Sequence, residues 1–324
     1  MNRVLLSQKA IQVSEKANMK LFFVFSMLTV LVIFSLIYLF YDFKSLPILL
    51  HLRVPRYMLT VFCGALLAGI GSVFQVMFNN PLAEPYILGI SSGAAMGSII
   101  ASLCGFIVLM PIFGFMGALL TMFLVWSLAN YKNNGDKNRL LFTGIITGMF
   151  MSAIISLLMY LFQKDTAIIL QILMGNTGHI FDQREWIYFL GSLFISLCFM
   201  VYLYLLSTPL NILTSGDEVA MSIGVNVHRL RKKIFFVSSI LIGICVSYVG
   251  IVGFVGLIVP QLVRLVIGAD QKKVFVGSTL SGIAFLLFCD FLAMHLTVLE
   301  LPLGIITSFV GCPVFIYILF GKKR

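Results

Sequence analysis

The chain consists of long apolar runs joined by short polar connections. The first run, Leu21–Tyr41, has 21 residues, which is longer than the roughly 7 to 15 apolar residues of a signal peptide. About 20 helical residues cross a hydrocarbon core of about 30 Å, so we expect this run to be a retained membrane-spanning helix. Eight further runs of similar length follow: Tyr57–Phe78, Ile87–Met110, Ile112–Asn130, Leu140–Phe162, Trp186–Leu206, Ile234–Phe254, Val274–Leu296 and Leu303–Phe320.

A tenth apolar run, Val255–Ile267, has only 13 residues and contains Pro260 and Arg264. By itself it fits either a short crossing or a re-entrant segment. Lys and Arg accumulate on the cytoplasmic side of short loops, so their positions decide between these options. With ten crossings and the N terminus inside, sixteen of the 22 Lys and Arg residues are cytoplasmic and five are outside. Without the crossing at Val255–Ile267, the numbers of Lys and Arg residues on the two sides of the membrane become almost equal. The charge pattern therefore favours ten spans with both termini in the cytoplasm.

The composition supports this interpretation. Of the 324 residues, 60% are hydrophobic and 10% are charged, whereas a soluble domain has about 25% charged residues. A soluble globule is therefore excluded, and we expect a cytoplasmic leader at residues 1–20 and a single transmembrane domain at residues 21–324. The formal net charge of +10 follows from loop topology, so it indicates membrane lipid rather than nucleic acid as the surrounding partner.

No residue pattern for covalent chemistry is present in the sequence. The six cysteines lie one to an apolar segment without a C-x-x-C pair, so we expect neither disulfides nor a metal cluster. The four histidines are scattered, and neither H-E-x-x-H nor a phosphate-binding G-x-x-x-x-G-K-[ST] loop occurs. We therefore expect no catalytic residue, no metal site and no cofactor bound by this chain. Energy from ATP would have to come from another chain.

Three connections are too patterned to be simple turns. Asn79–Tyr86 has a proline on either side of Glu84, which predicts a shaped loop at a membrane face. On the outer side, residues 165–175 predict a short helix that Asp165 or Thr166 would cap and that Gly175 would end. On the cytoplasmic side, residues 216–230 predict an acidic helix start, about two turns, a glycine stop and a second short helix. The expected fold is thus an all-α polytopic membrane protein with about ten transmembrane helices and two additional short helical regions.

Asp290 is an ionisable residue within an apolar run, and such residues are functional candidates by default. It could hold a proton or a cation, in which case the protein would be an ion-coupled secondary transporter. The other interpretation is a structural carboxyl group bonded to a neighbouring helix, which the lack of a second acid in the apolar runs favours. An inert structural or receptor protein is a third possibility. The breaks at Pro81, Pro85 and Pro260 argue against it, because an inert bundle gains nothing from them.

Arg53 and Arg56 stand at the outer face, where topology alone does not favour positive charge. A guanidinium group binds carboxylates in a bidentate manner, so these two residues could receive the acidic side chains of a partner protein. Contact with lipid headgroups is the alternative.

Five short motifs occur in order between Leu52 and the C terminus. They are Arg53-x-Pro55-Arg56, Asn80-Pro81-Leu82-Ala83-Glu84-Pro85, Leu88-Gly89-Ile90-Ser91-Ser92-Gly93-Ala94, Gly253-Phe254-Val255-Gly256-Leu257-Ile258-Val259-Pro260 and Glu300-Leu301-Pro302-Leu303-Gly304. In this order and spacing they resemble the FecCD-type permeases, the membrane subunits of ATP-driven importers for ferric siderophores, haem and cobalamin.

The resemblance implies a bacterial cytoplasmic-membrane protein that pairs with a second permease copy or a paralogue around a central pathway. Two ATP-binding subunits, which would use ATP and Mg²⁺, would bind on the inside, and an extracytoplasmic substrate-binding protein would dock on the outside. The expected cargo is an iron chelate, with ferric siderophore first and haem or cobalamin next. The resemblance does not choose between these chelates.

The resemblance also assigns residues. Residues Gly216–Gly224 match the helix that couples to the ATPase, Arg53 and Arg56 match the arginines that dock the binding protein, and the segment after Asp165 matches a short outer helix near the pathway mouth. The coupling candidates are Gly216, Asp217, Glu218, Ala220, Met221, Ser222 and Gly224, and the pathway or gating candidates are Asn80, Pro81, Glu84, Ser91, Ser92, Gly175, His179 and Pro260.

The chain departs from the family pattern at several positions. Gln261 and Gln271 stand where the family commonly has histidine, and an outer arginine of some members falls near Met294 and His295. His179 and His295 both lie toward the outer side, and histidine is among the residues that bind haem iron. A contact of either histidine with substrate is therefore an open possibility.

Overall fold

The computed structural model describes residues 29, 31–41, 45–130, 137–179, 181, 183–297 and 300–320, and the regular elements in this part of the chain are all helices. The longer elements are Leu31–Phe40, α3 (Val54–Met77), α4 (Ile90–Leu103), α5 (Met110–Asn130), α6 (Lys137–Leu161), α8 (Gln183–Leu205), α11 (Val227–Val249), α12 (Val255–Ile267), α13 (Gln271–His295) and α14 (Leu303–Phe320). The short elements are α2 (Leu46–Ile48), η1 (Leu49–Arg53), η2 (Pro85–Leu88), η3 (Ile107–Leu109), η4 (Gln163–Asp165), α7 (Thr166–Met174), α9 (Ser207–Leu213) and α10 (Asp217–Ser222).

Six helical segments in the described ranges are long and apolar enough to cross a membrane. They are Leu46–Met77, Ile107–Asn130, Lys137–Leu161, Glu185–Leu205, Val227–Val249 and Gln271–His295. The other four predicted spans contain the shorter apolar helices Leu31–Phe40, Ile90–Leu103, Val255–Ile267 and Leu303–Ile318. The all-α multi-span fold is confirmed, whereas the number of ten crossings stays a prediction. The leader at residues 1–20, the start of the first span and the C-terminal residues 321–324 lie outside the described residues.

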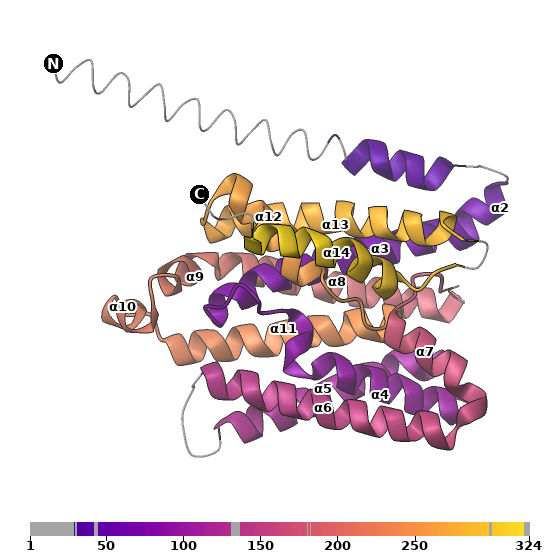
Figure 1. Cartoon of the computed structure of the whole chain (residues 1–324), viewed down its shortest axis with the longest axis horizontal. Helices are drawn as coiled ribbons and strands as arrows, with labels where there is room; N and C mark the ends of the chain where they lie inside the picture. The colour runs from indigo at the N-terminus through magenta and orange to yellow at the C-terminus, as the bar shows by residue number, and fades with distance from the viewer. Residues whose placement is uncertain are drawn as a thin grey trace.

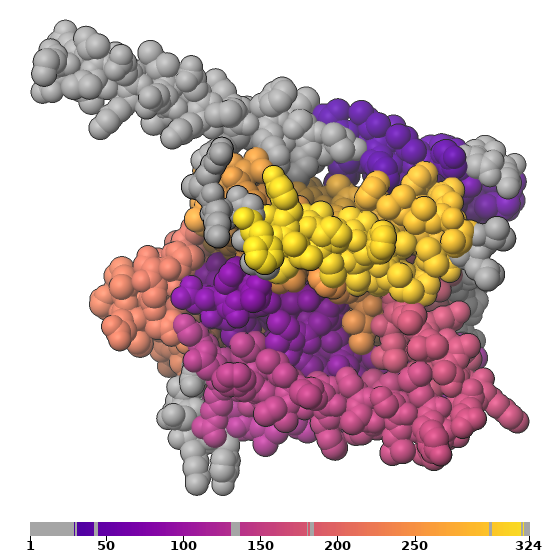
Figure 2. All heavy atoms as spheres, in the orientation of Figure 1, coloured from indigo at the N-terminus to yellow at the C-terminus, as the bar shows by residue number. Residues whose placement is uncertain are grey.

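The long helices lie side by side along one axis, and several of the small elements lie at the two ends (Figure 1). Helices α9 and α10 project from one end of the body, where they are visible as a separate lobe (Figure 2). Helices α2 and α7 lie at the opposite end (Figure 1). Following the predicted topology, we call the end with α9 and α10 the inner end and the opposite end the outer end.

An antiparallel pair, α3 and α13, forms the centre of the bundle. Close approach in the middle of the pair requires glycine, because a Cβ atom on Gly64 would lie 2.6 Å from the carbonyl oxygen of Gly282. At the outer end Arg56 meets Asp290, and at the inner end Ser72 meets Gln271. The pair is therefore packed along its length and bonded by polar groups near both ends. Small residues that let backbones approach are typical of helix contacts in membranes.

The segment 79–89 differs from its expectation as a loop at a membrane face. Proline at positions 81 and 85 stops the helix, and the chain then turns back into the bundle, where Glu84 accepts a hydrogen bond from the backbone N–H of Phe254. Phe254 precedes α12, and the 13 residues of α12 place it about 20 Å from the inner end. The second half of the segment is thus deep in the protein, where its non-helical backbone finds protein partners, whereas Asn79, Pro81 and Leu82 at its start are exposed.

The short outer helix agrees with its expectation. Helix α7 covers Thr166–Met174, with Asp165 at the N-cap position and Gly175 at the C-cap position, although the Asp165 side chain makes no capping hydrogen bond. Gly175 has φ +72°, a conformation that favours glycine. Its carbonyl oxygen accepts a hydrogen bond from the N–H of Leu303, which fixes the start of α14 against the end of α7.

Candidate functional sites

Within the inner lobe formed by α9 and α10, the small helix α10 is held on the bundle by an ion pair. Gly216 has φ +110° and Gly224 has φ +93°, so the turns on both sides of α10 use glycine conformations. Within α10, Ala220 is fully buried and the carboxylate of Asp217 accepts two hydrogen bonds from Arg231, at 2.7 and 2.8 Å. The Arg231 side chain is itself only 7% exposed. This ion pair, in which Nη2 of Arg231 contacts both carboxylate oxygens, therefore fixes the orientation of α10 on α11.

The free surface of α10 and the following residue is largely apolar. Val219, Met221 and Ile223 are 44%, 56% and 64% exposed, although they lie in a polar connection between two helices. Glu218 and Ser222 are exposed beside them. Exposed apolar side chains on a small helix are typical of a protein contact. Among the seven coupling candidates, the glycines shape the segment, Asp217 and Ala220 attach it to the body, and Glu218, Met221 and Ser222 face outward. Asp217 is bonded to Arg231 while its side chain is still 33% exposed, and its coupling role stays a prediction.

A polar network links this lobe to the central helices. The amide of Asn211 on α9 donates to the Asp270 carboxylate at 3.0 Å and accepts from the N–H of Gln271 at 2.7 Å. The hydrogen bond from Asn211 holds the pKa of Asp270 below its ordinary value. Gln271 is fully buried and bonds to the carbonyl oxygen of Ser72 and to Arg264. Movement of α9 and α10 would therefore reach α12 and α13 directly.

The two proline-broken segments of the sequence meet in the middle of the protein. In addition to the bond between Glu84 and Phe254 (2.5 Å), the Tyr86 hydroxyl accepts from the N–H of Val252 at 3.2 Å. Gln75 donates to the carbonyl oxygen of Leu257 at 3.0 Å, and Gln261 donates to that of Pro81 at 3.1 Å. Two pathway candidates bond locally: Asn80 accepts from the N–H of Leu82, and Ser91 donates to the carbonyl oxygen of Tyr86. Ser92 lines a cavity beside α6, and Pro260 is buried in α12.

Glu84 provides a direct test of this contact. Its carboxylate lies at the N terminus of α12, where negative charge is favoured. Without it, the backbone N–H of Phe254 would have no hydrogen-bond acceptor, because the first N–H groups of a helix have no partner within the helix. We expect Glu84→Ala to lower the free energy of unfolding by about 1 to 3 kcal/mol, the cost of an unsatisfied buried N–H. Glu84→Gln keeps an acceptor oxygen and should lose much less. Thermal unfolding of the purified variants measures both, and equal losses would contradict the assignment.

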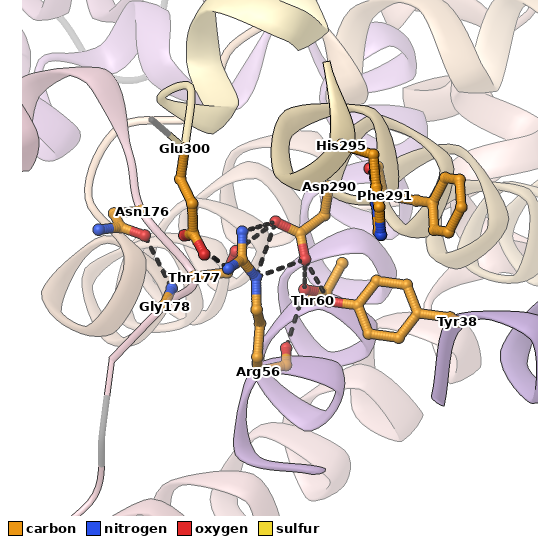
Figure 3. A network of polar contacts seen from close by, with 10 residues as sticks. All are labelled: Tyr38, Arg56, Thr60, Asn176, Thr177, Gly178, Asp290, Phe291, His295 and Glu300. Carbon is orange, nitrogen blue, oxygen red and sulfur yellow. Dashed lines mark hydrogen bonds and ion pairs between the residues drawn. The ribbon is translucent and has the colours of Figure 1, made fainter. Parts of the chain in front are cut away.

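At the outer end, Asp290 is the centre of a buried polar cluster (Figure 3). Asp290 is fully buried, and its carboxylate accepts two charge-assisted bonds from Arg56, each 3.0 Å long, through Nε and Nη2. Thr177 donates to it at 2.6 Å, and the Tyr38 hydroxyl donates as well. The Thr60 hydroxyl lies 3.3 Å from the carboxylate and also reaches the carbonyl oxygen of Arg56 at 2.9 Å. The cluster thus joins the helix Leu31–Phe40, α3, the segment after α7, and α13.

This arrangement corrects the expectation for Arg56. Its side chain is 9% exposed and binds Asp290 on one side and Glu300 on the other, with Nη1 to Glu300 Oε2 at 2.7 Å. It is therefore not an open docking group. Arg53 is half-buried, and its guanidinium donates to the carbonyl oxygens of Leu39 and Tyr41 at the end of the first described helix.

The cluster also decides between the two interpretations of Asp290. Both of its carboxylate oxygens accept hydrogen bonds from the protein, and a positive charge is already paired with it. A carboxylate has about four lone-pair sites, and these donors occupy them. A cation would find no free oxygen here. The geometry supports a structural carboxylate bonded to neighbouring helices.

The two outer histidines lie in different surroundings. The His179 side chain is 36% exposed, contacts Glu185 at 3.3 Å, and lines a cavity of about 400 Å³ together with Asn176 and Gln171. His295 stacks on Phe291 with ring centroids 4.3 Å apart, and its Nδ1 lies 2.8 Å from the carbonyl oxygen of Phe291. In the described part of the chain, no group of three or more His, Cys, Asp or Glu residues is placed to hold a metal ion.

Several residues of these sites gave no signal in the sequence. Tyr38, Thr60 and Thr177 are single hydroxyl groups in three distant segments, and Arg231 lies in a basic run that topology already explained. By contrast, the motifs recognised in the sequence contact one another in the structure. The first contacts the fifth through Arg56 and Glu300, and the second contacts the fourth through Glu84 and Phe254. The third packs on α6, where Gly148 lies close to Gly89.

Comparison with known proteins gives a consistent result. The family model described as the FecCD transport family matches residues 17–321. The chain is 35% identical over 292 residues to the hemin transport system permease protein HmuU of Yersinia pestis, covering 85% of this chain and 84% of that protein. It is 34% identical over 274 residues to the cobalamin import system permease protein BtuC of Halobacterium salinarum, covering 84% and 73%. A solved structure described as an inward-facing conformation of a putative metal-chelate type ABC transporter superposes with a TM-score of 0.82 at 29% identity, covering 94% and 99%.

Proposed function

Because this chain belongs to the FecCD transport family, we propose that it is the membrane subunit of an ATP-driven importer that carries an iron chelate into the bacterial cytoplasm. Like its relatives it is a multi-pass permease and not an enzyme. The names of the relatives support hemin, cobalamin and metal chelates as the substrate class. Ferric siderophore is our first candidate, and haem or cobalamin come next.

The observation that carries this proposal is the inner lobe. Helix α10 presents exposed apolar side chains on a support fixed by the Asp217–Arg231 pair. We propose that the importer contains two ATPase subunits, which bind ATP and Mg²⁺. Each of them holds α10 of one permease copy in a groove. ATP-driven closure of those subunits would move α9 and α10, and the Asn211 network would pass the movement to α12 and α13. Transport then consists of a population shift between inward-open and outward-open states.

The translocation pathway is proposed to lie between two copies of the chain. Helix α14 (yellow, upper centre) and α6 (magenta, lower edge) lie on the face seen in Figure 2. Both expose large apolar side chains, including Phe309 at 77% and Met149 at 69%. Cavities of about 760 Å³ beside α14 and about 670 Å³ beside α6 lie on these helices, and the second contains Ser92, Ser152 and Ser156. If a two-fold axis passed by this face, the cavities of both copies would lie around one channel. A paralogue in place of the second copy would give the same geometry.

An extracytoplasmic binding protein is proposed to dock at the outer end. Of the two candidate arginines, Arg53 is half-buried and can still reach a partner, although it also contacts two carbonyl oxygens. Arg56 can take part only if an acidic side chain of the partner displaces Glu300, whose side chain is 58% exposed. The docking role is therefore assigned to Arg53 first.

Uptake in proteoliposomes tests the proposed class. With the cognate ATPase, binding protein and ferric siderophore, we expect accumulation that requires ATP inside the vesicles and stops when ATP is replaced by a non-hydrolysable analogue. A proton gradient without the ATPase should give no accumulation. Transport driven by the gradient alone would show that the protein is an ion-coupled transporter. ATP-driven uptake of haem or cobalamin alone would keep the class and change the substrate.

A further inference from the structure

A groove lies between α8 and α11, and three basic side chains line it near the inner end of the bundle. It forms a cavity of about 720 Å³. From α11 it is lined by Arg229, Lys232, Lys233, Phe236 and Val237. These positions recur every three or four residues, so they share one face of the helix. The cations are at the start of α11, and the apolar side chains follow toward the middle of the membrane.

The opposite wall of the groove is apolar with one hydroxyl group. Cys198, Phe199 and Tyr202 of α8 line it, and their spacing also places them on one helix face. The same two helices continue toward the outer end, where Ile195 and Ile240 line a second cavity of about 360 Å³. Residues 229–237 of α11 span about 12 Å, close to half of a hydrocarbon core of about 30 Å. The groove therefore matches the depth of the inner leaflet.

The three cations of the groove have no carboxylate partner among the described residues, since none of them forms an ion pair there. Arg231, in the same basic run, is the contrast, because it points inward and binds Asp217. All three groove cations are exposed, and Lys232 Nζ lies 5.9 Å from the centroid of the Trp126 ring. Tryptophan is enriched at the level of lipid headgroups. The unpaired charges thus stand where a lipid phosphate would be.

We propose that this groove is a binding site for one anionic phospholipid of the inner leaflet. The phosphate lies between Arg229, Lys232 and Lys233, and an acyl chain lies along Phe236, Val237 and Cys198. Basic pockets between transmembrane helices on the cytoplasmic side are suited to anionic headgroups. A second copy of the chain fits the groove less well, because a two-fold axis there would bring the cations of both copies together.

Lipid binding to the purified full chain in detergent tests the proposal, with dioleoyl phosphatidylglycerol and dioleoyl phosphatidylcholine as probes and native mass spectrometry as the readout. We expect one phosphatidylglycerol per chain, bound more tightly than phosphatidylcholine. Lys232→Gln with Lys233→Gln should weaken phosphatidylglycerol binding about tenfold or more, because each cation near a membrane surface contributes about 1 kcal/mol. Lys272→Gln with Lys273→Gln is the matched control. It removes two exposed inner charges outside the groove and should leave the affinity unchanged.

A second variant separates the groove from its charges. Cys198 is exposed on the wall of the groove, so Cys198→Trp fills the acyl-chain position and keeps all three cations. We expect it to lose phosphatidylglycerol as well. Equal weakening by both lysine pairs, unchanged binding in Cys198→Trp, or no preference over phosphatidylcholine would each overturn the proposal. The assay contains neither ATP nor chelate, so its result is independent of the proposed transport function.

Discussion

Replacing Met221 and Ile223 by aspartate is expected to abolish the ATP hydrolysis that depends on the permease, and uptake with it, while the permease stays folded. Both side chains are more than half exposed on the inner lobe, so the change costs the isolated chain little. In a complex they would be buried against the ATPase, where loss of each anchor costs about 2 kcal/mol or more. Two such losses correspond to a fall in affinity of roughly a thousandfold. ATPase activity of the reconstituted complex and co-purification of the ATPase measure this.

The control adds the same charge to the same connection. Thr214→Asp with Ser215→Asp places two carboxylates at exposed positions before α10, away from the apolar side chains, and should keep most of the activity. Asp217→Lys would not test the contact, because it leaves Arg231 buried without its partner. Full ATPase activity in the Met221 and Ile223 variant would remove the coupling role of α10.

Asp290→Ala is expected to cause the largest loss of stability. The substitution leaves the buried Arg56 guanidinium with only the half-exposed Glu300 as a counter-charge, and breaking a buried pair in this way costs about 3 to 5 kcal/mol. Thermal unfolding of the purified protein measures the loss. Removing both charges, with Arg56→Met and Asp290→Leu, should restore part of the stability, because a buried pair replaced by apolar groups is often neutral.

Glu300→Gln is the matched control on the same arginine. Glu300 also binds Arg56, but its side chain is 58% exposed, and exposed ion pairs contribute about 0 to 1 kcal/mol. Its loss should therefore be small. Similar losses for Asp290→Ala and Glu300→Gln would show that burial of the cluster does not determine its strength. ATP-driven uptake by a folded Asp290→Asn variant would further separate this residue from ion coupling.

The outer cluster shows where reasoning from the sequence reached its limit. The sequence placed Arg56 at the outer face and Asp290 within an apolar run, but it assigned the first to a partner protein and left the role of the second open. Their pairing joins residues 234 positions apart, and no local pattern encodes which of several outer groups meets a given arginine. The segment 79–89 is similar: its prolines indicated a break, and only the packing decided that the break turns inward to Phe254.

The sequence by itself determined the elements and their rough placement. Apolar run length, charge asymmetry and glycine and proline positions specify the spans, the short helix α7 and the acidic helix α10, because the transfer of side chains into lipid and the restriction of backbone angles are local properties. The tertiary structure alone decided which groups are free. It shows that Asp217 and Arg56 are occupied, that Met221 and Ile223 are exposed, and that three cations of α11 share a groove, because burial depends on neighbours that lie far away along the chain.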